Sequence, residues 1–123
     1  MKSKTKKWIY EKDGEKYEIG IIEYNKQILF IWSFDTERYG LNKQGVGSKE
    51  YLKIEEFAKK KKIKRLYGDL FSKENVRAFD YFWKKQGFRI INKKDNDWKD
   101  HWLILENILT EPSCGANIII KEL

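Results

Sequence analysis

The sequence predicts a single domain of the α/β (α+β) class that covers residues 1–123. Strand-like runs alternate with two stretches of helical periodicity, and 123 residues can bury one substantial core but not two. The low mean hydropathy comes from the 37% of charged residues, because 41% of the chain is still hydrophobic. We therefore expect a folded chain and not a disordered one.

The first half of the chain is expected to form three strands and a helix. Residues 8–10 and 17–24 flank an Asp13-Gly14 turn and predict a hairpin. Residues 27–34 are nearly continuously apolar, which is typical of a central strand buried on both faces. Between residues 48 and 62 the apolar side chains recur at helical spacing and predict a helix, the positions being Tyr51, Ile54, Phe57 and Ala58.

The second half is expected to alternate strands with one helix. Residues 63–71 predict a strand, and Ser72 is well placed to cap a helix over 73–86 that ends at Gly87. We expect short strands at 88–91 and 101–106, separated by a polar loop and paired as a hairpin. Residues 117–120 have strand composition, but nothing in the sequence fixes their partner.

A short glycine turn, Gly45-Val46-Gly47-Ser48, precedes the first predicted helix. Such a turn presents free backbone N–H groups and the positive end of the helix dipole, which together suit a phosphate. Gly45 and Gly47 can also serve only to permit a tight turn into the helix. Binding of a phosphate-bearing ligand becomes the stronger interpretation when a second sequence block is considered with this turn.

The second block runs from Asn75 through Ala78 to Gly87-Phe88. With the glycine turn and the order of strands and helices, it resembles the GNAT superfamily of acetyl-CoA-dependent N-acetyltransferases over residues 28–106. The resemblance implies a mixed, mostly antiparallel central sheet with two main helices. The family usually begins with a strand and two helices, whereas only a hairpin fits before Gln27. The resemblance therefore implies a small, N-terminally shortened member whose acceptor pocket is open or completed by another subunit.

The family's glycine turn carries Arg/Gln-x-x-Gly-x-Gly/Ala, and its amides hold the pyrophosphate of the cofactor. Here the six residues are Asn42-Lys43-Gln44-Gly45-Val46-Gly47, so Asn42 replaces the usual Arg or Gln. The resemblance implies acetyl-CoA as cofactor, with its pantetheine arm paired to the end of the preceding strand. The cofactor-binding residues that it implies are Phe34, Asp35, Gln44, Gly45, Val46, Gly47, Ser48, Asn75, Ala78 and Phe82.

The family's general-acid tyrosine has no direct counterpart. Its second signature, roughly Asn-x-x-Ala-x-x-Phe-Tyr-x-x-x-Gly-Phe, is present with one extra residue. Counting from Asn75 places the tyrosine at Phe82, and counting back from Gly87-Phe88 places it at Trp83. Neither side chain has a proton to donate to the departing thiolate. Tyr81 lies one place earlier and takes this role only if the helix register shifts.

Acetyl transfer to an amine also needs a group that accepts the amine proton. Asp69, near the end of the second central strand, is the best-placed carboxylate, followed by Glu23, Asp35 and Glu37. For each of them an ordinary solvated carboxylate is the competing interpretation. Backbone N–H groups near Phe34 can polarise the thioester carbonyl. The catalytic candidates are therefore Tyr81 and Asp69.

The formal charge of +7 favours an anionic partner such as nucleic acid, a polyphosphate cofactor or an acidic protein. The run 59–62 consists of four lysines and is extended by Lys64 and Arg65. It fits a nucleic-acid surface, but a solvated helix end whose cations complement the C-terminal dipole is the favoured interpretation.

Several classes are disfavoured by simple counts. One cysteine, Cys114, cannot form an internal disulfide, and a single histidine argues against a metal site of the usual kind. The longest apolar run, residues 28–32, is far shorter than the roughly 20 residues of a membrane span. The lysine-rich start is not followed by a signal-peptide core, so a cytoplasmic location is expected.

The expected function is acetyl-CoA-dependent transfer of an acetyl group to an amine of a small molecule or protein that the sequence does not name. Two alternatives stay open: a catalytically weak or inactive acetyl-CoA-binding GNAT-like module, and a basic nucleic-acid-binding protein. An exposed sheet edge or an unpaired tail strand would permit a homodimer.

Overall fold

The computed structural model describes residues 3–36, 39–41, 45–70, 79–110 and 117–123, with the side chains of Leu70 and Tyr81 excepted. The elements in chain order are β1 (Lys4–Lys12), β2 (Glu15–Tyr24), β3 (Ile28–Phe34), α1 (Val46–Lys60), β4 (Arg65–Leu70), a π-helical turn η3 (Phe79–Trp83), β5 (Arg89–Asn92), α3 (Trp98–Ile108) and β6 (Asn117–Glu122).

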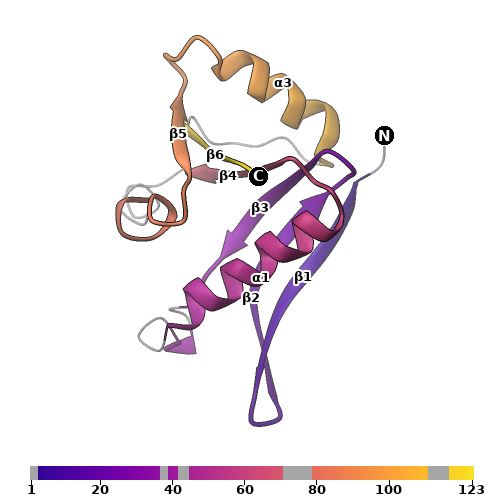
Figure 1. The fold of residues 1–123 in the computed structure, drawn as a ribbon, viewed down its shortest axis with the longest axis vertical. Helices are drawn as coiled ribbons and strands as arrows, with labels where there is room; N and C mark the ends of the chain where they lie inside the picture. Colours follow the sequence, from indigo (N-terminus) through magenta and orange to yellow (C-terminus); the bar gives the residue numbers. More distant parts are fainter. Residues whose placement is uncertain (1–2, 37–38, 42–44, 71–78, 111–116) are drawn as a thin grey trace.

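The strands form one six-stranded sheet in the order β1-β2-β3-β4-β6-β5 (Figure 1). Among the described strands, β3 and β4 pair in parallel, and every other neighbouring pair is antiparallel. Helix α1 makes the crossover that a parallel pair requires. The expected mixed, mostly antiparallel α+β sheet is confirmed, and so are the first hairpin and the central position of β3.

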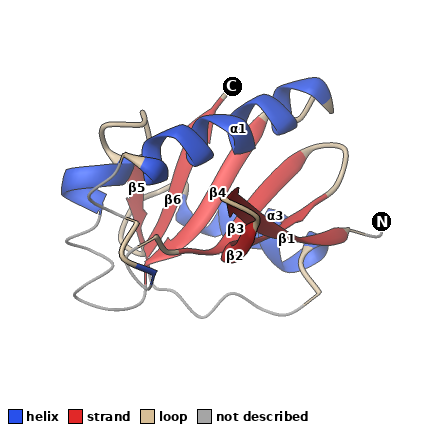
Figure 2. Cartoon of the chain, turned by 90° about the horizontal axis from the view of Figure 1, so that it is seen from below, coloured by secondary structure: helices blue, strands red, loops and turns tan. Residues whose placement is uncertain are grey.

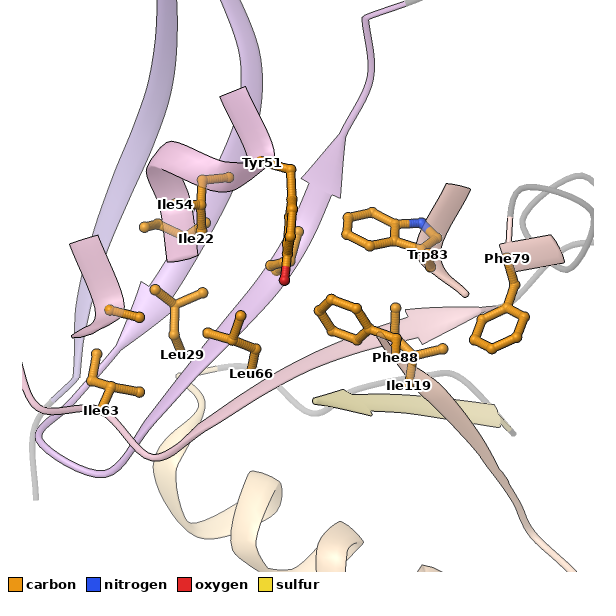
Figure 3. Packing of buried hydrophobic residues seen from close by; sticks show 12 residues of the cluster. Ile22, Leu29, Tyr51, Ile54, Ile63, Leu66, Phe79, Trp83, Phe88 and Ile119 are labelled. Carbon is orange, nitrogen blue, oxygen red and sulfur yellow. The ribbon is translucent and has the colours of Figure 1, made fainter. Parts of the chain in front are cut away.

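The two helices lie on opposite faces of the sheet (Figure 2). Along β3 the buried side chains alternate: Leu29 and Ile31 face α1, whereas Ile28 and Phe30 face α3. The α1 face carries the larger apolar cluster (Figure 3), which includes Ile22, Tyr51, Ile54, Leu66, Phe79, Trp83, Phe88 and Ile119. The α3 face is filled by Tyr67, Ile91, Leu105, Leu109, Ile118 and Ile120.

The prediction of a strand at 101–106 is wrong, because these residues belong to α3. The side chains of this segment that pack on the sheet include Trp98, Trp102, Leu105 and Leu109, at spacings of four, three and four residues. That spacing is helical, but the continuous apolar run 102–105 masks it, since such a run suits a buried strand as well. The expected polar loop is correspondingly shorter and ends at Asp97.

The tail strand supplies the pairing that the sequence left open. β6 lies between β4 and β5 and is antiparallel to both, with Ile118, Ile119 and Ile120 buried. The expected hairpin between residues 88–91 and 101–106 is therefore wrong, because β5 pairs with β6. The tail strand is paired on both sides, so it offers no free edge through which a dimer could form. The helix expected at 73–86 is described only from Phe79 onward, and Ser72 lies outside the described residues.

Glu23 links four segments that are distant in the sequence. Its side chain is buried, at 1% exposure, and accepts hydrogen bonds from the Ser3 hydroxyl, Trp32 Nε1 at 2.9 Å, and Thr110 N and Oγ1 at 2.8 and 3.2 Å. Burial alone would raise the pKa of Glu23, but these hydrogen bonds outweigh it and the pKa lies below its ordinary value. A carboxylate held in this way is structural, which argues against the lesser expectation that Glu23 serves as a base.

We predict that Glu23→Gln lowers the free energy of unfolding by about 2 kcal/mol at pH 7, because a buried set of donors loses a charged acceptor. The folded pKa of Glu23 is depressed, so its contribution is present above the unfolded pKa of about 4.3 and is lost as pH falls. Urea unfolding at several pH values should therefore show a smaller loss of stability below pH 5 in the variant than in the wild type. Parallel pH profiles for the two proteins would contradict this account of Glu23.

Candidate functional site

The parallel strands β3 and β4 separate before either one ends. The last pair of their ladder is Ile31 opposite Gly68, yet β3 continues to Phe34 and β4 to Leu70. Beyond that pair, β3 remains bonded to β2, and β4 remains bonded to β6. The backbone edges of the two strand ends that face each other are therefore outside the ladder, and the sheet parts at this place.

A β-bulge lies at the start of this parting. In the β2–β3 ladder Ile22 is opposite Ile31, but Ile21 is opposite Ser33, so Trp32 is an extra residue on β3. A bulge bends its strand and increases the local twist, which turns the end of β3 away from β4. The hydrogen bond from the Trp32 indole to Glu23 anchors the extra residue. Sequence reasoning missed this role of Trp32, because a continuous apolar run shows no break in alternation.

The N-terminus of α1 presents uncapped backbone amides. Gly45 occupies the N-cap in the left-handed region with φ 72°, no side chain in the described part of the chain caps the helix, and its first turn holds no acidic residue. The first intrahelical bond of this end runs from Lys49 N to Gly45 O at 3.4 Å. The amides of Val46, Gly47 and Ser48 precede it and lie at the positive end of the helix dipole, where an anion is favoured.

The helix start is fixed against the sheet and against η3. Val46 is buried in a small cluster with Ile19 and Leu41. Gly47 is also buried, and a Cβ placed there would lie 3.3 Å from Phe82 Cε1 and 3.5 Å from Thr36 Oγ1. Gly47 is therefore required by close packing, whereas Gly45 is required by its backbone angle. Both interpretations of the glycine turn have a physical basis in this fold.

Three aromatic rings gather beside the end of β3. Phe34 stacks on Phe82 with ring centroids 5.8 Å apart, and it meets Trp83 edge-on at the same distance. Tyr51 of α1 packs edge-on against both Phe82 and Trp83. The structure thus brings together the strand end, the glycine turn and both positions at which the family's tyrosine was expected.

The extra residue in the second signature is accommodated by η3. The Lys84 N–H donates to the Phe79 carbonyl at 2.8 Å, an i→i+5 bond that adds one residue to a helical turn. Gly87, with φ 97°, then ends the segment as expected. Because of this wide turn, Phe82 and Trp83 both contact Phe34. Tyr81 lies within η3, but its side chain is not described.

Asp69 lies on the other face of the sheet from this aromatic group. A side chain at Gly68 would meet Ile119 of the α1 face, so the next residue, Asp69, faces the α3 side with Tyr67 and Ile118. Asp69 is half-buried on β4, one residue past the last pair of the β3–β4 ladder.

The other predicted site residues are only partly placed. Asp35 follows β3 directly, is exposed, and donates its N–H to the Ile19 carbonyl at 2.7 Å. Ser48 is exposed in the first turn of α1. Four further candidates lie outside the described part of the chain: Glu37, Gln44, Asn75 and Ala78.

His101 lies on α3 and not in a strand, and it is buried at 7% exposure. Its Nδ1 is 2.7 Å from Tyr67 Oη, and its Nε2 is 3.5 Å from Asp97 Oδ2. Burial lowers the pKa of His101, which favours the neutral ring, and its Nδ1 shares a hydrogen bond with the tyrosine hydroxyl. This pairing secures α3 to β4 and gives His101 a structural place.

Within the described ranges, no group of three or more histidine, cysteine, aspartate or glutamate side chains could hold a metal ion. In that same part of the chain, no helix has the length and apolarity needed to cross a membrane.

Comparison with solved structures shows that this is the fold of the GNAT acetyltransferases. An acetyltransferase from Streptococcus agalactiae 2603 matches over 88% of this chain and 64% of its own, at 20% identity and a TM-score of 0.58. Tetrahymena GCN5 matches over 98% and 68%, at 16% identity and 0.57. A GNAT family acetyltransferase from Elizabethkingia anophelis with acetyl-CoA bound matches over 92% and 72%, at 19% identity and 0.56.

The resemblance inferred from the sequence is thus confirmed at the level of the fold. This chain spans about two thirds of the length of these structures. No protein-family model matches the sequence, and no curated protein sequence does.

We predict that Gly45→Ala and Gly47→Ala each cost about 1 kcal/mol of folding stability, for different reasons. The first substitution strains a left-handed backbone with open space around its Cβ, and the second crowds the Phe82 ring. Replacing Phe82 with Leu should therefore reduce the cost of Gly47→Ala and leave that of Gly45→Ala unchanged. Double-mutant cycles by urea unfolding measure the two couplings. Equal costs in both backgrounds would contradict the packing role assigned to Gly47.

Proposed function

We propose that this protein is an acetyl-CoA-dependent N-acetyltransferase. The observation that carries the proposal is the parting of β3 from β4 beside the uncapped N-terminus of α1. A strand edge outside its ladder can bond an amide-containing chain, and free helix amides can bond a phosphate. Pantetheine and pyrophosphate are the corresponding parts of acetyl-CoA, and the Elizabethkingia anophelis protein of the same fold has acetyl-CoA bound.

In this proposal the cofactor is recognised mainly by backbone groups. The amides of Val46, Gly47 and Ser48 hold the pyrophosphate, and the end of β3 at Phe34 and Asp35 pairs with the pantetheine arm. The ring of Phe82 borders the path between these two places, since it packs against both Phe34 and Gly47. Gln44, Asn75 and Ala78 complete the proposed cofactor set from segments outside the described residues.

The acceptor amine approaches from the α3 side of the parting, where Asp69 lies. The amine nitrogen attacks the thioester carbonyl carbon, a C–N bond forms, and the C–S bond breaks. The amine proton passes to Asp69 directly or through water, and the departing thiolate takes up a proton. Backbone N–H groups at the bulged end of β3 hydrogen-bond the carbonyl oxygen as its negative charge develops. The acceptor is an amine on a small molecule or protein.

The acid that protonates the thiolate is not supplied by the two rings that contact Phe34. Phe82 and Trp83 both contact Phe34, and neither carries a hydroxyl. Tyr51 carries a hydroxyl and packs against the same rings, but its side chain is fully buried. Burial is the main cause that raises the pKa of Tyr51, and the nearby Glu55 carboxylate raises it further. Tyr81 is adjacent in the π-helical turn and is the proposed acid.

The two hydroxyl-free rings also favour a second candidate function. A protein that keeps the parted strands and the helix amides but lacks the acid would bind acetyl-CoA without transferring the acetyl group. The two functions differ in one observable, the release of CoA thiol in the presence of an amine.

We predict that Ser48→Asp stabilises the protein but weakens acetyl-CoA binding. A carboxylate in the first turn of α1 interacts favourably with the helix dipole, by about 0.5 kcal/mol. The same charge repels the pyrophosphate, and we expect the affinity measured by calorimetric titration to fall about tenfold. Ser48→Ala is the matched control and should change neither quantity much. Unchanged affinity in Ser48→Asp would contradict pyrophosphate binding at this helix end.

We predict that Tyr81→Phe and Asp69→Asn lower the rate of thiol release and leave acetyl-CoA affinity unchanged. The assay follows CoA thiol from acetyl-CoA with a panel of small amines and lysine-containing peptides. Phe82→Tyr is the informative companion, because it restores a hydroxyl at one position of the family's tyrosine and should raise the rate. Acetyl-CoA binding without thiol release for any amine would favour the binding module. Full activity in Tyr81→Phe would exclude Tyr81 as the acid.

A further inference from the structure

The positive charge of this protein is concentrated at one end of the fold. The end opposite the parting is formed by the C-terminus of α1, the turn between β2 and β3, and the start of β1 (Figure 1). We call it the basic end and define it by eight exposed lysines: Lys4, Lys6, Lys26, Lys59, Lys60, Lys61, Lys62 and Lys64.

Specific contacts bring these three segments together. The Lys64 N–H donates to the Gln27 carbonyl at 3.1 Å, which joins the segment after α1 to the β2–β3 turn. Lys4 is opposite Tyr24 in the β1–β2 ladder. The Lys61 ammonium lies 5.6 Å from the Tyr24 ring centroid and 5.3 Å from that of Phe57. The lysines therefore form one surface and not separate charged tails.

The ion pairs among the described residues neutralise little of this charge. Lys59 pairs with Glu55 at 3.3 Å, but Glu55 also binds Lys121 at 2.9 Å. Glu23 is buried and uses its oxygens within the fold. Within the described residues, five of the eight lysines form neither an ion pair nor a cation–π contact: Lys4, Lys26, Lys60, Lys62 and Lys64.

The dipole of α1 explains only part of this arrangement. Cations in the last turn, Lys59 and Lys60, complement the negative helix end. Lys4, Lys6 and Lys26 come from other elements and gain nothing from that turn. Their accumulation at the same end costs repulsion unless an anion binds there.

Half-buried aromatic rings lie among the lysines. Trp8 and Tyr24 each meet Phe57 edge-on, at 6.0 and 5.0 Å between ring centroids, and Lys6 lies over the Trp8 ring. Bases of a flexible strand can stack on such rings while lysines contact the phosphates. The exposed large apolar side chains Ile9, Tyr39, Leu52 and Leu103 are not part of this surface. It therefore offers little that would insert into a membrane.

We propose that the basic end binds single-stranded nucleic acid through its phosphates, without sequence selectivity. Lysine supplies point charges and not the bidentate contacts that read base edges. The site is separate from the proposed cofactor site, since the 15 residues of α1 hold the two ends about 22 Å apart. This binding does not depend on acetyl transfer.

The test measures binding of a fluorescent 20-nucleotide single strand by anisotropy between 50 and 200 mM salt. The triple variant Lys60→Gln, Lys62→Gln, Lys64→Gln should weaken binding at least tenfold at 100 mM salt. It should also reduce the magnitude of the salt slope by about 2, since each single-strand phosphate contact contributes about 0.7. The matched control Lys16→Gln, Lys85→Gln, Lys99→Gln removes the same charge elsewhere and should keep the wild-type slope.

Several outcomes would overturn the proposal. One is an equal loss of affinity in the control variant, which would mean that only net charge matters. Another is binding of polyglutamate or of phosphatidylserine vesicles as tight as that of the oligonucleotide, which would assign the surface to an acidic protein or a membrane. Acetyl-CoA titration of the patch variant should match the wild type, so failure of this proposal and failure of the acetyltransferase proposal are distinguishable.

Discussion

The parting of β3 from β4 is the constraint on which the rest of the candidate site depends. A parallel pair held together along its whole length would leave no backbone edge for a ligand. Here the ladder stops at Ile31 and Gly68, and the extra residue Trp32 bends β3 at that point. A residue of the neighbouring strand holds this bend, because the buried Glu23 carboxylate accepts hydrogen bonds from both the Trp32 indole and the Thr110 amide. A residue outside the site therefore sets the geometry of the site.

The two ends of α1 lie in regions of different electrostatic character. The N-terminus of α1 has uncapped amides and no acidic residue in its first turn, so it is ready for a compact anion. Its C-terminus carries lysines and meets more lysines from β1 and the β2–β3 turn. The packing between these ends is mainly apolar and aromatic, with Tyr51 and Ile54 of α1 fully buried (Figure 3), and it includes the buried carboxylate of Glu55 paired with Lys121. Rigid packing along the helix keeps the two charged regions apart.

Sequence reasoning succeeded where the determinants are local. The glycine turn, the first hairpin and α1 all follow from short-range patterns, and the extra residue in the second signature is now explained by the π-helical turn at 79–83. It failed where the determinants are distant pairings. The helix at 98–108 is an exception, because its apolar run 102–105 suits a buried strand as well. The partner of β6 and the contact between Glu23 and Thr110, which are 87 residues apart, depend on how distant segments meet in the fold. The bulge at Trp32 belongs to the same class, since register is a property of two strands.

The most direct test of the central claim is amide hydrogen exchange with and without acetyl-CoA. If the cofactor lies in the parting, the amides of Phe34 and of residues 46–48 become protected together on binding, while those of β1 and α3 do not change. The Asp35 amide already bonds the Ile19 carbonyl and should change little. Protection confined to the basic end, or none at Phe34 and 46–48 despite measurable binding, would contradict the account.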